Sequence, residues 1–285
     1  MREVKRYIGD VAGVFDTHAH LYDKRFAEEG VKPSDVLERA SEAGVTRILV
    51  PADNLETSRL AVAYAREYNG LSGVSLYSSV GVHPHEASSW SADVRAALYE
   101  LLKERKENRI CAIGEIGLDY YYDLSPRDIQ RSVYEEQLLM AYELDMPIIL
   151  HERDATGDSM DILRSLYKGG KMRECPGVCH CCSASPEIAT ELVKMGFYIG
   201  FDGPITFKNN KNTPAVCAAV PIERIVVETD SPYLTPAPNR GAMNEPGFVP
   251  YVLEKVAEIK DVSVAEAAHI TTANALRLYE INEEI

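Results

Sequence analysis

Eight short apolar runs recur along the chain, and the segments between them carry the start and stop signals of helices. The runs are continuous rather than alternating, which is typical of strands that are buried on both faces of a parallel sheet. Ser185-Pro186 begins one helical segment that Gly196 closes, and Pro33-Ser34 precedes another that ends at Gly44. The predicted strands cover residues 14–16, 47–51, 77–82, 110–114, 147–150, 177–179, 197–201 and 224–228.

Strands that alternate with helices call for parallel pairing, and eight such units predict an α/β fold of the closed (β/α)8 type, a TIM barrel. An open doubly wound sheet is the runner-up architecture. It would carry a Gly-x-Gly-x-x-Gly turn after the first strand, where this chain has His18-Ala19-His20. At 285 residues and 46% hydrophobic content, with no Ser/Gly/Pro-rich linker, residues 1–285 are expected to form one domain.

The two ends and the cysteines suggest a cellular location. No apolar segment follows the charged start at residues 1–6, and nowhere do about eighteen apolar residues run together, so a cytoplasmic protein without membrane contact is expected. Four of the six cysteines fall within residues 175–182, without the spacing of paired C-x-x-C zinc clamps. Reduced, mostly buried thiols are therefore predicted, and a redox or zinc cluster is the alternative.

Residues of metal-ligand type lie at the ends of five predicted strands. His18 and His20 are two residues apart on a strand, so both imidazoles face the same side. Glu115, His151, His180 and Asp230 follow other strands, and all of them would meet at the C-terminal face of the barrel, where such enzymes carry catalysis. Of the seven histidines, only His269 falls in a predicted helix.

These six side chains supply four imidazoles and two carboxylates, enough for one or two divalent ions. Glu115, with two oxygens, is the natural bridge, and ions about 3.5 to 4 Å apart would generate a nucleophile from water and clamp a phosphoryl group. Asp230 is expected to bind one ion and to accept a proton from the attacking water. The competing interpretation is a structural role, since a lone histidine at a strand end is usually just hydrogen-bonded. Imidazoles suit Zn²⁺, whereas carboxylates and a phosphate substrate suit Mg²⁺ or Mn²⁺. No sequence feature calls for an organic cofactor.

Several motifs carry a family resemblance in the same order along the chain. They are Phe15-Asp16-Thr17-His18-Ala19-His20-Leu21, Gly81-Val82-His83-Pro84-His85, Ile113-Gly114-Glu115-Ile116-Gly117-Leu118-Asp119-Tyr120, Pro147-Ile148-Ile149-Leu150-His151 with Arg153-Asp154-Ala155, Val227-Glu228-Thr229-Asp230-Ser231-Pro232-Tyr233-Leu234, and Arg240-Gly241 with Asn244-Glu245-Pro246. Nearly from end to end, the chain resembles the TatD-type metal-dependent deoxyribonucleases.

The resemblance implies a barrel of the amidohydrolase superfamily, a site for one or two metal ions, and 3′-to-5′ exonuclease or related DNase activity. It assigns the metal to His18, His20, Glu115, His151, His180 and Asp230. There are departures. The family's usual His-Cys-Phe-Ser-Gly is His180-Cys181-Cys182-Ser183-Ala184 here, and Glu152 stands where a serine is frequent. These changes leave the ligands intact but alter the surroundings of the substrate.

Substrate contacts are predicted from the loops that follow the strands. Of His83 and His85, one is expected to contact a substrate phosphate and the other to pack beneath the loop, and His83 is favoured for the phosphate. Arg153 and Arg240 are expected to form a cationic rim. Lys208 and Lys211 are better read as solvated surface charge. Tyr120-Tyr121-Tyr122 either stacks a base or packs at the barrel mouth.

The charge of the chain limits how it can meet a nucleic acid. A net charge of −14 excludes a broad basic surface, so contact with DNA is expected to be weak, local and directed at strand ends. No sequence feature indicates an obligate protein partner. Two other functions remain open: hydrolysis of a carbonyl substrate (an amide, a lactone or an aminoacyl-tRNA ester) at the same site, and a non-catalytic binding protein, for which a lost ligand would be the marker.

Overall fold

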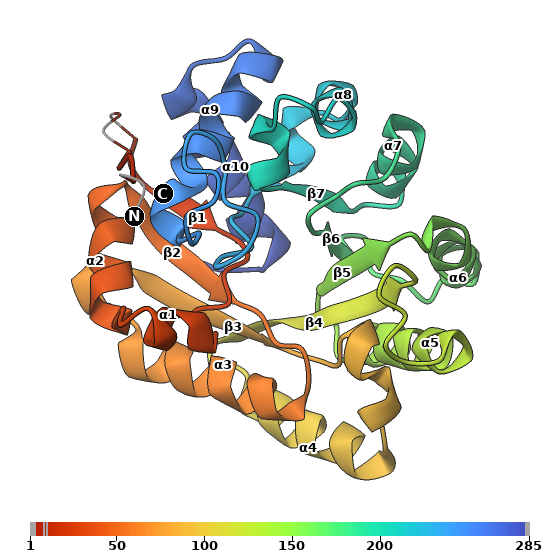
Figure 1. Ribbon diagram of the computed structural model, residues 1–285. Helices are drawn as coiled ribbons and strands as arrows, with labels where there is room; N and C mark the ends of the chain where they lie inside the picture. The colour runs from red at the N-terminus through yellow and green to blue at the C-terminus, as the bar shows by residue number, and fades with distance from the viewer. Residues whose placement is uncertain (1–3, 8, 10, 283–285) are drawn as a thin grey trace.

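The computed structural model describes residues 4–282 except residues 8 and 10, and these residues form an eight-stranded parallel sheet. The strands pair in sequence order from β1 to β8, and they line the centre of the molecule in Figure 1. Their bounds are β1 Val14–Asp16, β2 Val45–Val50, β3 Ser75–Val80, β4 Ile110–Asp119, β5 Ile148–Arg153, β6 Gly177–Cys179, β7 Tyr198–Phe201 and β8 Ile225–Val227.

Helices connect the strands and lie around the outside of the sheet (Figure 1). The α-helices are α1 Lys24–Glu28, α2 Pro33–Glu42, α3 Leu55–Tyr68, α4 Ala92–Lys103, α5 Arg127–Glu143, α6 Thr156–Lys168, α7 Pro186–Lys194, α8 Asn212–Ala219, α9 Val249–Lys260 and α10 Val264–Leu278. Short 3-10 turns are η1 Leu71–Gly73, η2 Pro84–Ser89, η3 Gly203–Thr206, η4 Ile222–Arg224 and η5 Pro246–Phe248.

Backbone contacts between the first and last strands bring the two edges of the sheet together. The amide of Thr17 donates to the carbonyl of Val227 at 3.1 Å, and Ala19 forms a parallel bridge with Ser231. The predicted (β/α)8 barrel is thereby confirmed, and the open doubly wound sheet is wrong.

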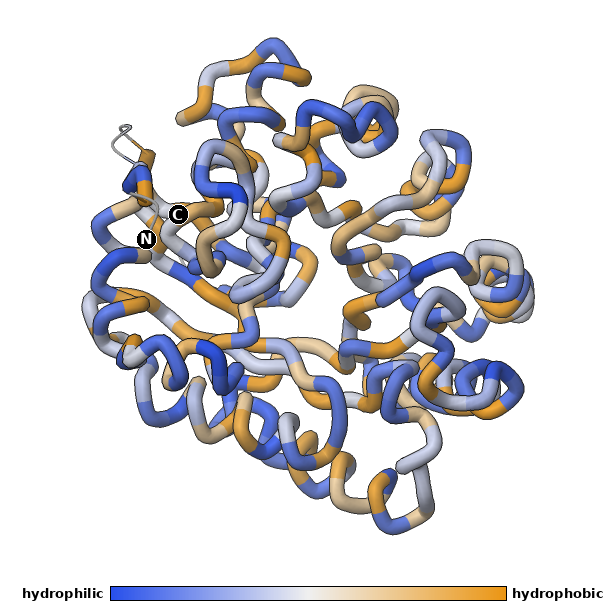
Figure 2. Tube along the Cα trace, viewed as in Figure 1, coloured by the Kyte–Doolittle hydropathy of each residue, from blue (hydrophilic) through white to orange (hydrophobic). Residues whose placement is uncertain are grey.

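Burial explains why the apolar runs predict the strands. All ten residues of β4 are buried, and in Figure 2 hydrophobic segments follow the strands while hydrophilic segments lie mostly on the outer helices. The main difference from the prediction lies at the ends of β4 and β5. Both strands continue past the predicted Gly114 and Leu150, because Ile116 to Asp119 pair with Leu150 to Arg153 although this stretch carries the polar side chains of the barrel mouth.

The helix start signals are confirmed where the structure describes them. Ser185 caps α7 by accepting from the amide of Ile188, and Pro186 occupies the first helical turn. The described part of the chain contains no helix that is both long and apolar enough to cross a membrane. All six cysteines are free thiols, four of them buried. Residues 1–3 and 283–285, at the two ends of the predicted domain, lie outside the described residues.

Candidate metal centre

His18 and His20 lie just beyond the end of β1, where backbone hydrogen bonds to the neighbouring segments hold them. The amide of the intervening Ala19 donates to the carbonyl of Leu49, and that of His20 donates to the carbonyl of Ser231. Both imidazoles are buried, and their Nε2 atoms approach each other to 3.3 Å. The structure thus brings the two rings together, as the two-residue spacing predicts.

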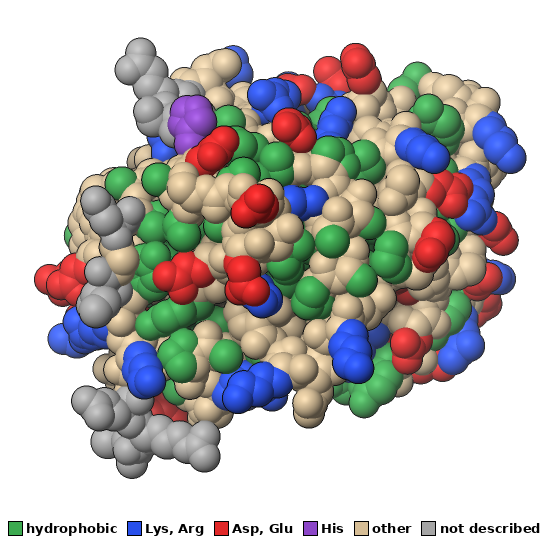
Figure 3. Space-filling model, turned by 90° about the horizontal axis from the view of Figure 1, so that it is seen from above, with side chains coloured by type: hydrophobic (Ala, Val, Ile, Leu, Met, Phe, Trp, Pro, Cys, Tyr) green, Lys and Arg blue, Asp and Glu red, His purple; other side chains and the backbone are tan. Residues whose placement is uncertain are grey.

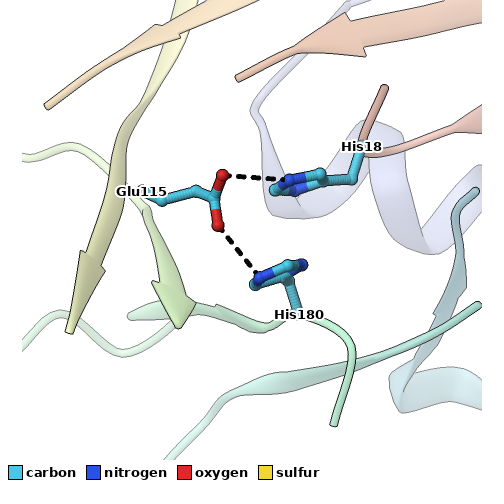
Figure 4. A group of neighbouring side chains, drawn as sticks. All are labelled: His18, Glu115 and His180. Atoms are coloured by element: carbon cyan, nitrogen blue, oxygen red, sulfur yellow. Dashed lines mark ion pairs between the residues drawn. The ribbon is translucent and has the colours of Figure 1, made fainter. Parts of the chain in front are cut away.

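Glu115 in β4 lies at the centre of the site, with one carboxylate oxygen toward each of two histidine pairs. Its Oε1 is 3.2 Å from Nε2 of His18 and 3.4 Å from Nε2 of His20. Its Oε2 is 3.0 Å from Nε2 of His180 and 3.6 Å from Nδ1 of His151. Figure 4 shows the carboxylate between His18 and His180, one oxygen facing each ring.

Asp230 closes the same cluster from the segment after β8. Its Oδ1 lies 3.4 Å from Nε2 of His20 and 3.8 Å from Nε2 of His18. Its amide donates to the carbonyl of His18 at 2.8 Å, and its backbone has the left-handed conformation (φ +54°) that aspartate and asparagine adopt more readily than most residues. All six side chains that the sequence predicts as ligands therefore converge on one point.

The donor atoms of this cluster fit a divalent cation. Nε2 of His18 faces Nε2 of His20, Oε1 of Glu115 and Oδ1 of Asp230 at once, and a single proton can serve only one of these contacts. Buried lone pairs that face one another are costly unless a cation lies among them. The metal-ligand groupings of the described residues are His18, Glu115 and His180; His18, His20 and Asp230; His83, Glu115 and His151; and His20, Asp53 and Glu115.

The pKa values of the cluster reflect this crowding. Burial opposes protonation of His20, but the hydrogen bond to Asp230 and the charges of Asp53 and Glu115 raise its pKa to about 10. Burial and the neighbouring His180 lower the pKa of His18 to about 4. In the metal-free protein at neutral pH, His20 is thus protonated and His18 is neutral.

Glu115 remains ionised in this environment. Burial would raise its pKa, but His18 and His180 hold the pKa well below the ordinary value of a glutamic acid. The pKa of Asp230 is lowered as well, because its hydrogen bond to His20 outweighs the effect of burial. Both carboxylates are therefore in the form that binds a metal.

The carboxylate of Asp119, at the end of β4, supports His151 from the side away from Glu115. Its Oδ2 accepts from Nε2 of His151 at 3.2 Å and from Nε2 of His85 at 2.8 Å. Its Oδ1 accepts from the amides of Tyr121 and Tyr122 at 3.0 and 2.9 Å. Burial would lower the pKa of His151, but the hydrogen bonds to Asp119 and Glu115 raise it to about 9. The sequence prediction missed Asp119 because the strand was predicted to end at Gly114.

A second acidic residue, Asp53, was also missed. It follows β2 and lies partly buried beside His20 and Glu115, with its Oδ2 accepting from the hydroxyl of Tyr22 at 3.1 Å. Burial raises its pKa. Asp53 stands three residues after Val50, the last residue of β2, which is the same kind of strand-end position that pointed to Glu115 and Asp230.

Three further buried acids, Asp16, Asp202 and Glu228, lie close to the ligand Asp230. Asp16 accepts from the hydroxyl of Thr229 at 2.6 Å, and Glu228 accepts from the amide of Cys181, with its Oε1 3.7 Å from Nδ1 of His180. Burial raises the pKa of Asp16 to about 7 and that of Asp202 to about 8. Asp16 and Glu228 hold the backbone beside the ligands, because they accept from the amides of His18, Thr229 and Cys181.

The predicted substrate contacts divide between the cavity and the surface. A cavity of about 480 Å³ opens onto the cluster, within the usual range for ligand pockets, and His83, His85 and Arg153 line it. His83 is buried, Nδ1 accepting from the amide of His85, and burial lowers its pKa well below the ordinary value. Arg240 lies over the ring of Phe207, with its guanidinium carbon 3.7 Å from the centroid, and is not among the residues that line the cavity. Lys208 and Lys211 are exposed.

Comparisons with known proteins agree with this geometry. The family model described as TatD related DNase matches residues 15–280. An uncharacterized metal-dependent hydrolase, YabD of Bacillus subtilis, is 41% identical over 94% of this chain and 100% of its own length. A 3′-5′ ssDNA/RNA exonuclease, TatD of Shigella flexneri, is 33% identical over 94% of this chain and 99% of its own. The crystal structure of YJJV, a TatD homologue from Escherichia coli K12, superposes with a TM-score of 0.83 at 29% identity, covering 94% of this chain and 98% of that one.

Proposed function

The chain belongs to the TatD related DNase family of metal-dependent hydrolases, and from this premise we propose that it cleaves phosphodiester bonds of DNA, removing nucleotides from the 3′ end of a strand. The observation that carries the proposal is the position of Glu115, whose two oxygens face two separate histidine pairs. Placed in this way, Glu115 would hold metal ions together with either histidine pair, and such ions would supply the charge stabilisation that in-line displacement at phosphorus needs. The name of the Shigella flexneri relative, a 3′-5′ ssDNA/RNA exonuclease, supports the same chemistry.

We assign the metal to the six converging side chains: His18, His20, Glu115, His151, His180 and Asp230. The mixed set of imidazoles and carboxylates accommodates Zn²⁺, Mn²⁺ or Mg²⁺, in one or two positions. When bound, the ions would lower the pKa of water and offset the charge that develops on the phosphoryl oxygens.

The protein's own groups then perform the remaining steps. Asp230 is ionised and only 15% exposed, so its carboxylate can accept the proton of the attacking water. His83 is neutral over the physiological range because of its lowered pKa, and it can donate only one ring hydrogen. We assign contacts with the substrate phosphates to His83, His85 and Arg153, which line the cavity, and a more distant contact to Arg240.

The surface charge supports contact at a strand end rather than along a duplex. On the face shown in Figure 3, basic and acidic side chains are interspersed, with no continuous basic stripe. Together with the net charge of −14, this predicts weak binding with few phosphate contacts. We also propose that the protein acts in the cytoplasm, where its six free thiols would stay reduced.

The test is the digestion of 3′- and 5′-end-labelled single-stranded DNA with Mn²⁺ or Mg²⁺, beside EDTA. Asp230→Asn is expected to abolish the ladder that shortens from the 3′ end. Asp261→Asn is the matched control, because Asp261 is exposed and its backbone has the same φ of +54°, so asparagine fits equally well at both positions. An intact strand with the metal-loaded protein refutes the proposal and favours hydrolysis of a carbonyl ester or amide at the same site.

A further inference from the structure

Exposed tyrosines gather at the mouth of the metal centre. Among the described residues, five tyrosines are exposed: Tyr121, Tyr122, Tyr142, Tyr167 and Tyr233. Three of them, Tyr121, Tyr122 and Tyr233, follow β4 or β8 at the barrel face that carries the site, and Tyr122 and Tyr233 line its cavity. A large aromatic side chain that stays in water beside a catalytic cavity is available to a ligand.

The first group, which we call the β4 rim, consists of Tyr121, Tyr122 and Arg153. The guanidinium carbon of Arg153 lies 3.9 Å from the ring centroid of Tyr121 and 4.9 Å from that of Tyr122. The Tyr122 ring also meets His85 edge to face, with centroids 5.4 Å apart. Because Asp119 binds both tyrosine amides, the backbone beneath the two rings is fixed although the rings are 58% and 53% exposed.

The second group, the β8 rim, consists of Tyr233 and Arg25. The guanidinium carbon of Arg25 lies 3.7 Å from the Tyr233 centroid, and the Tyr233 hydroxyl donates to Asp23 at 2.9 Å. The Tyr233 ring packs edge to face against His20, with centroids 5.9 Å apart. The β8 rim therefore repeats the chemistry of the β4 rim, an exposed phenol ring next to a guanidinium group.

The two rims lie on opposite sides of the metal centre. One follows β4 and β5, the other follows β8 and the segment after β1, and these strands are about half a turn apart in a barrel of eight strands in sequence order. Tyr122, Arg153 and Tyr233 all line the cavity that contains Glu115. A phosphate held by metal ions at this centre would thus have an aromatic ring and a guanidinium group on either side, with Arg25 paired to Asp23.

Aromatic rings and guanidinium planes are general stacking partners for nucleobases, since every base has a π face. The guanidinium group of Arg153 beside the Tyr121 ring also suits a phosphate next to a stacked base, whereas Arg25 is paired with Asp23. On the premise of the proposed DNA cleavage, we propose that the β4 rim and the β8 rim are two base-stacking sites, one for each nucleotide that flanks the cleaved phosphate. Two bases held on opposite walls are splayed apart and can be neither stacked on each other nor paired. The substrate is accordingly a strand with at least two unpaired nucleotides at its end.

The test compares oligonucleotides that have a base or an abasic residue at either of the two 3′-terminal positions. With Mn²⁺-loaded wild-type protein, kcat/KM for the first cleavage is expected to fall roughly 10-fold or more when either base is removed. In the double variant Tyr121→Leu and Tyr122→Leu, the dependence on one of the two bases is lost. In Tyr233→Leu, the dependence on the other base is lost.

Tyr167→Leu is the matched control, because Tyr167 is 49% exposed but lies in α6 and does not line the cavity. It is expected to retain both dependences. Equal rates of wild-type protein on normal and abasic strands, or rim variants that keep the wild-type ratios, would overturn the proposal.

A second measurement separates this proposal from the proposed function. Binding of the same oligonucleotides is followed by fluorescence anisotropy with Ca²⁺ in place of Mn²⁺, so the effect of each base is measured even if no strand is cut. Loss of affinity for abasic strands without any cleavage would sustain stacking while refuting the nuclease activity. Cleavage with no effect of the bases on either rate or affinity would refute stacking and sustain the proposed nuclease activity.

Discussion

The carboxylate of Asp119 offers the sharpest test of how the metal ligands are held. Two oxygens accept four hydrogen bonds here, from two histidine Nε2 atoms and from the amides of Tyr121 and Tyr122. Asparagine has one acceptor oxygen and one NH2 group. In either orientation of the amide, the asparagine NH2 group of Asp119→Asn faces two of the four N–H donors, so these two lose their acceptor.

The size of the effect follows from which bond is lost. Because an ionised carboxylate only accepts, Nε2 of His151 must donate to Asp119, which leaves Nδ1 directed at the metal centre. Hydrogen bonds to charged groups contribute about 1.5–3 kcal/mol, and removing the partner of a ligating histidine typically weakens metal binding about 10- to 100-fold. We therefore expect Asp119→Asn to weaken binding of Mn²⁺ by about this factor.

Isothermal titration calorimetry of EDTA-stripped protein with Mn²⁺ measures the effect, after circular dichroism has shown that the variant is folded. Asp161→Asn is the control, since the Asp161 side chain is 79% exposed on α6. If Asp119→Asn bound Mn²⁺ as tightly as the wild-type protein, Asp119 would not position His151, and the reasoning would be refuted.

Further outcomes are expected from the backbone, from pH and from metal removal. A Cβ on Gly117 (φ +147°) would lie 1.8 Å from the His151 carbonyl oxygen. Gly117→Ala should therefore lower the free energy of unfolding, measured by urea denaturation, by at least about 3 kcal/mol. The control variant Gly157→Ala should not lower it, because the space around Gly157 is open. In EDTA, Tm should fall as the pH rises from 7 to 10. Folding raises the pKa of His20 to about 10 and that of His151 to about 9, from an unfolded value of about 6.5. The stability gained from protonating these residues in the folded state is complete below the unfolded value and is lost as the pH rises through 9 to 10. A Tm that is flat or rises over this interval would contradict this assignment. Tm should rise with increasing concentration of Mn²⁺ or of Zn²⁺, because the ions bind only the folded site. A Tm that does not depend on either metal would count against a metal site here.

Much of the barrel and the convergence of the six candidate ligands could be predicted, because both depend on local patterns. Buried parallel strands appear as continuous apolar runs, and the strand-end positions place Glu115 and Asp230 at the same face whatever the details of packing. His18 and His20 need only the two-residue period of an extended chain. None of these inferences requires knowledge of which side chains touch.

The role of Asp119 was beyond the same reasoning. Asp119 supports His151 only because β4 continues past its apolar part and pairs with the end of β5, a register that the pattern of apolar residues does not contain. Asp53 differs, because it stands at a strand-end position after β2 that the same reasoning covers, and the pairing of β2 with β1 brings it close to His20. Arg240, which the sequence places in a cationic rim after the last strand, lies over Phe207 because the long segment before α9 carries it there.

One carboxylate joins the metal centre to the proposed β4 rim, because Asp119 binds His151 through one oxygen and the amides of Tyr121 and Tyr122 through the other. The loss of this carboxylate should therefore weaken metal binding and also reduce the dependence of cleavage on the base at that rim. Replacing Tyr122 by leucine should change only the second quantity, since its ring touches no ligand among the six. In the double variant Asp119→Asn and Tyr122→Leu, the two effects on base dependence should combine to less than their product, because both act on the same ring. Fully multiplicative effects would mean that the two supports act independently.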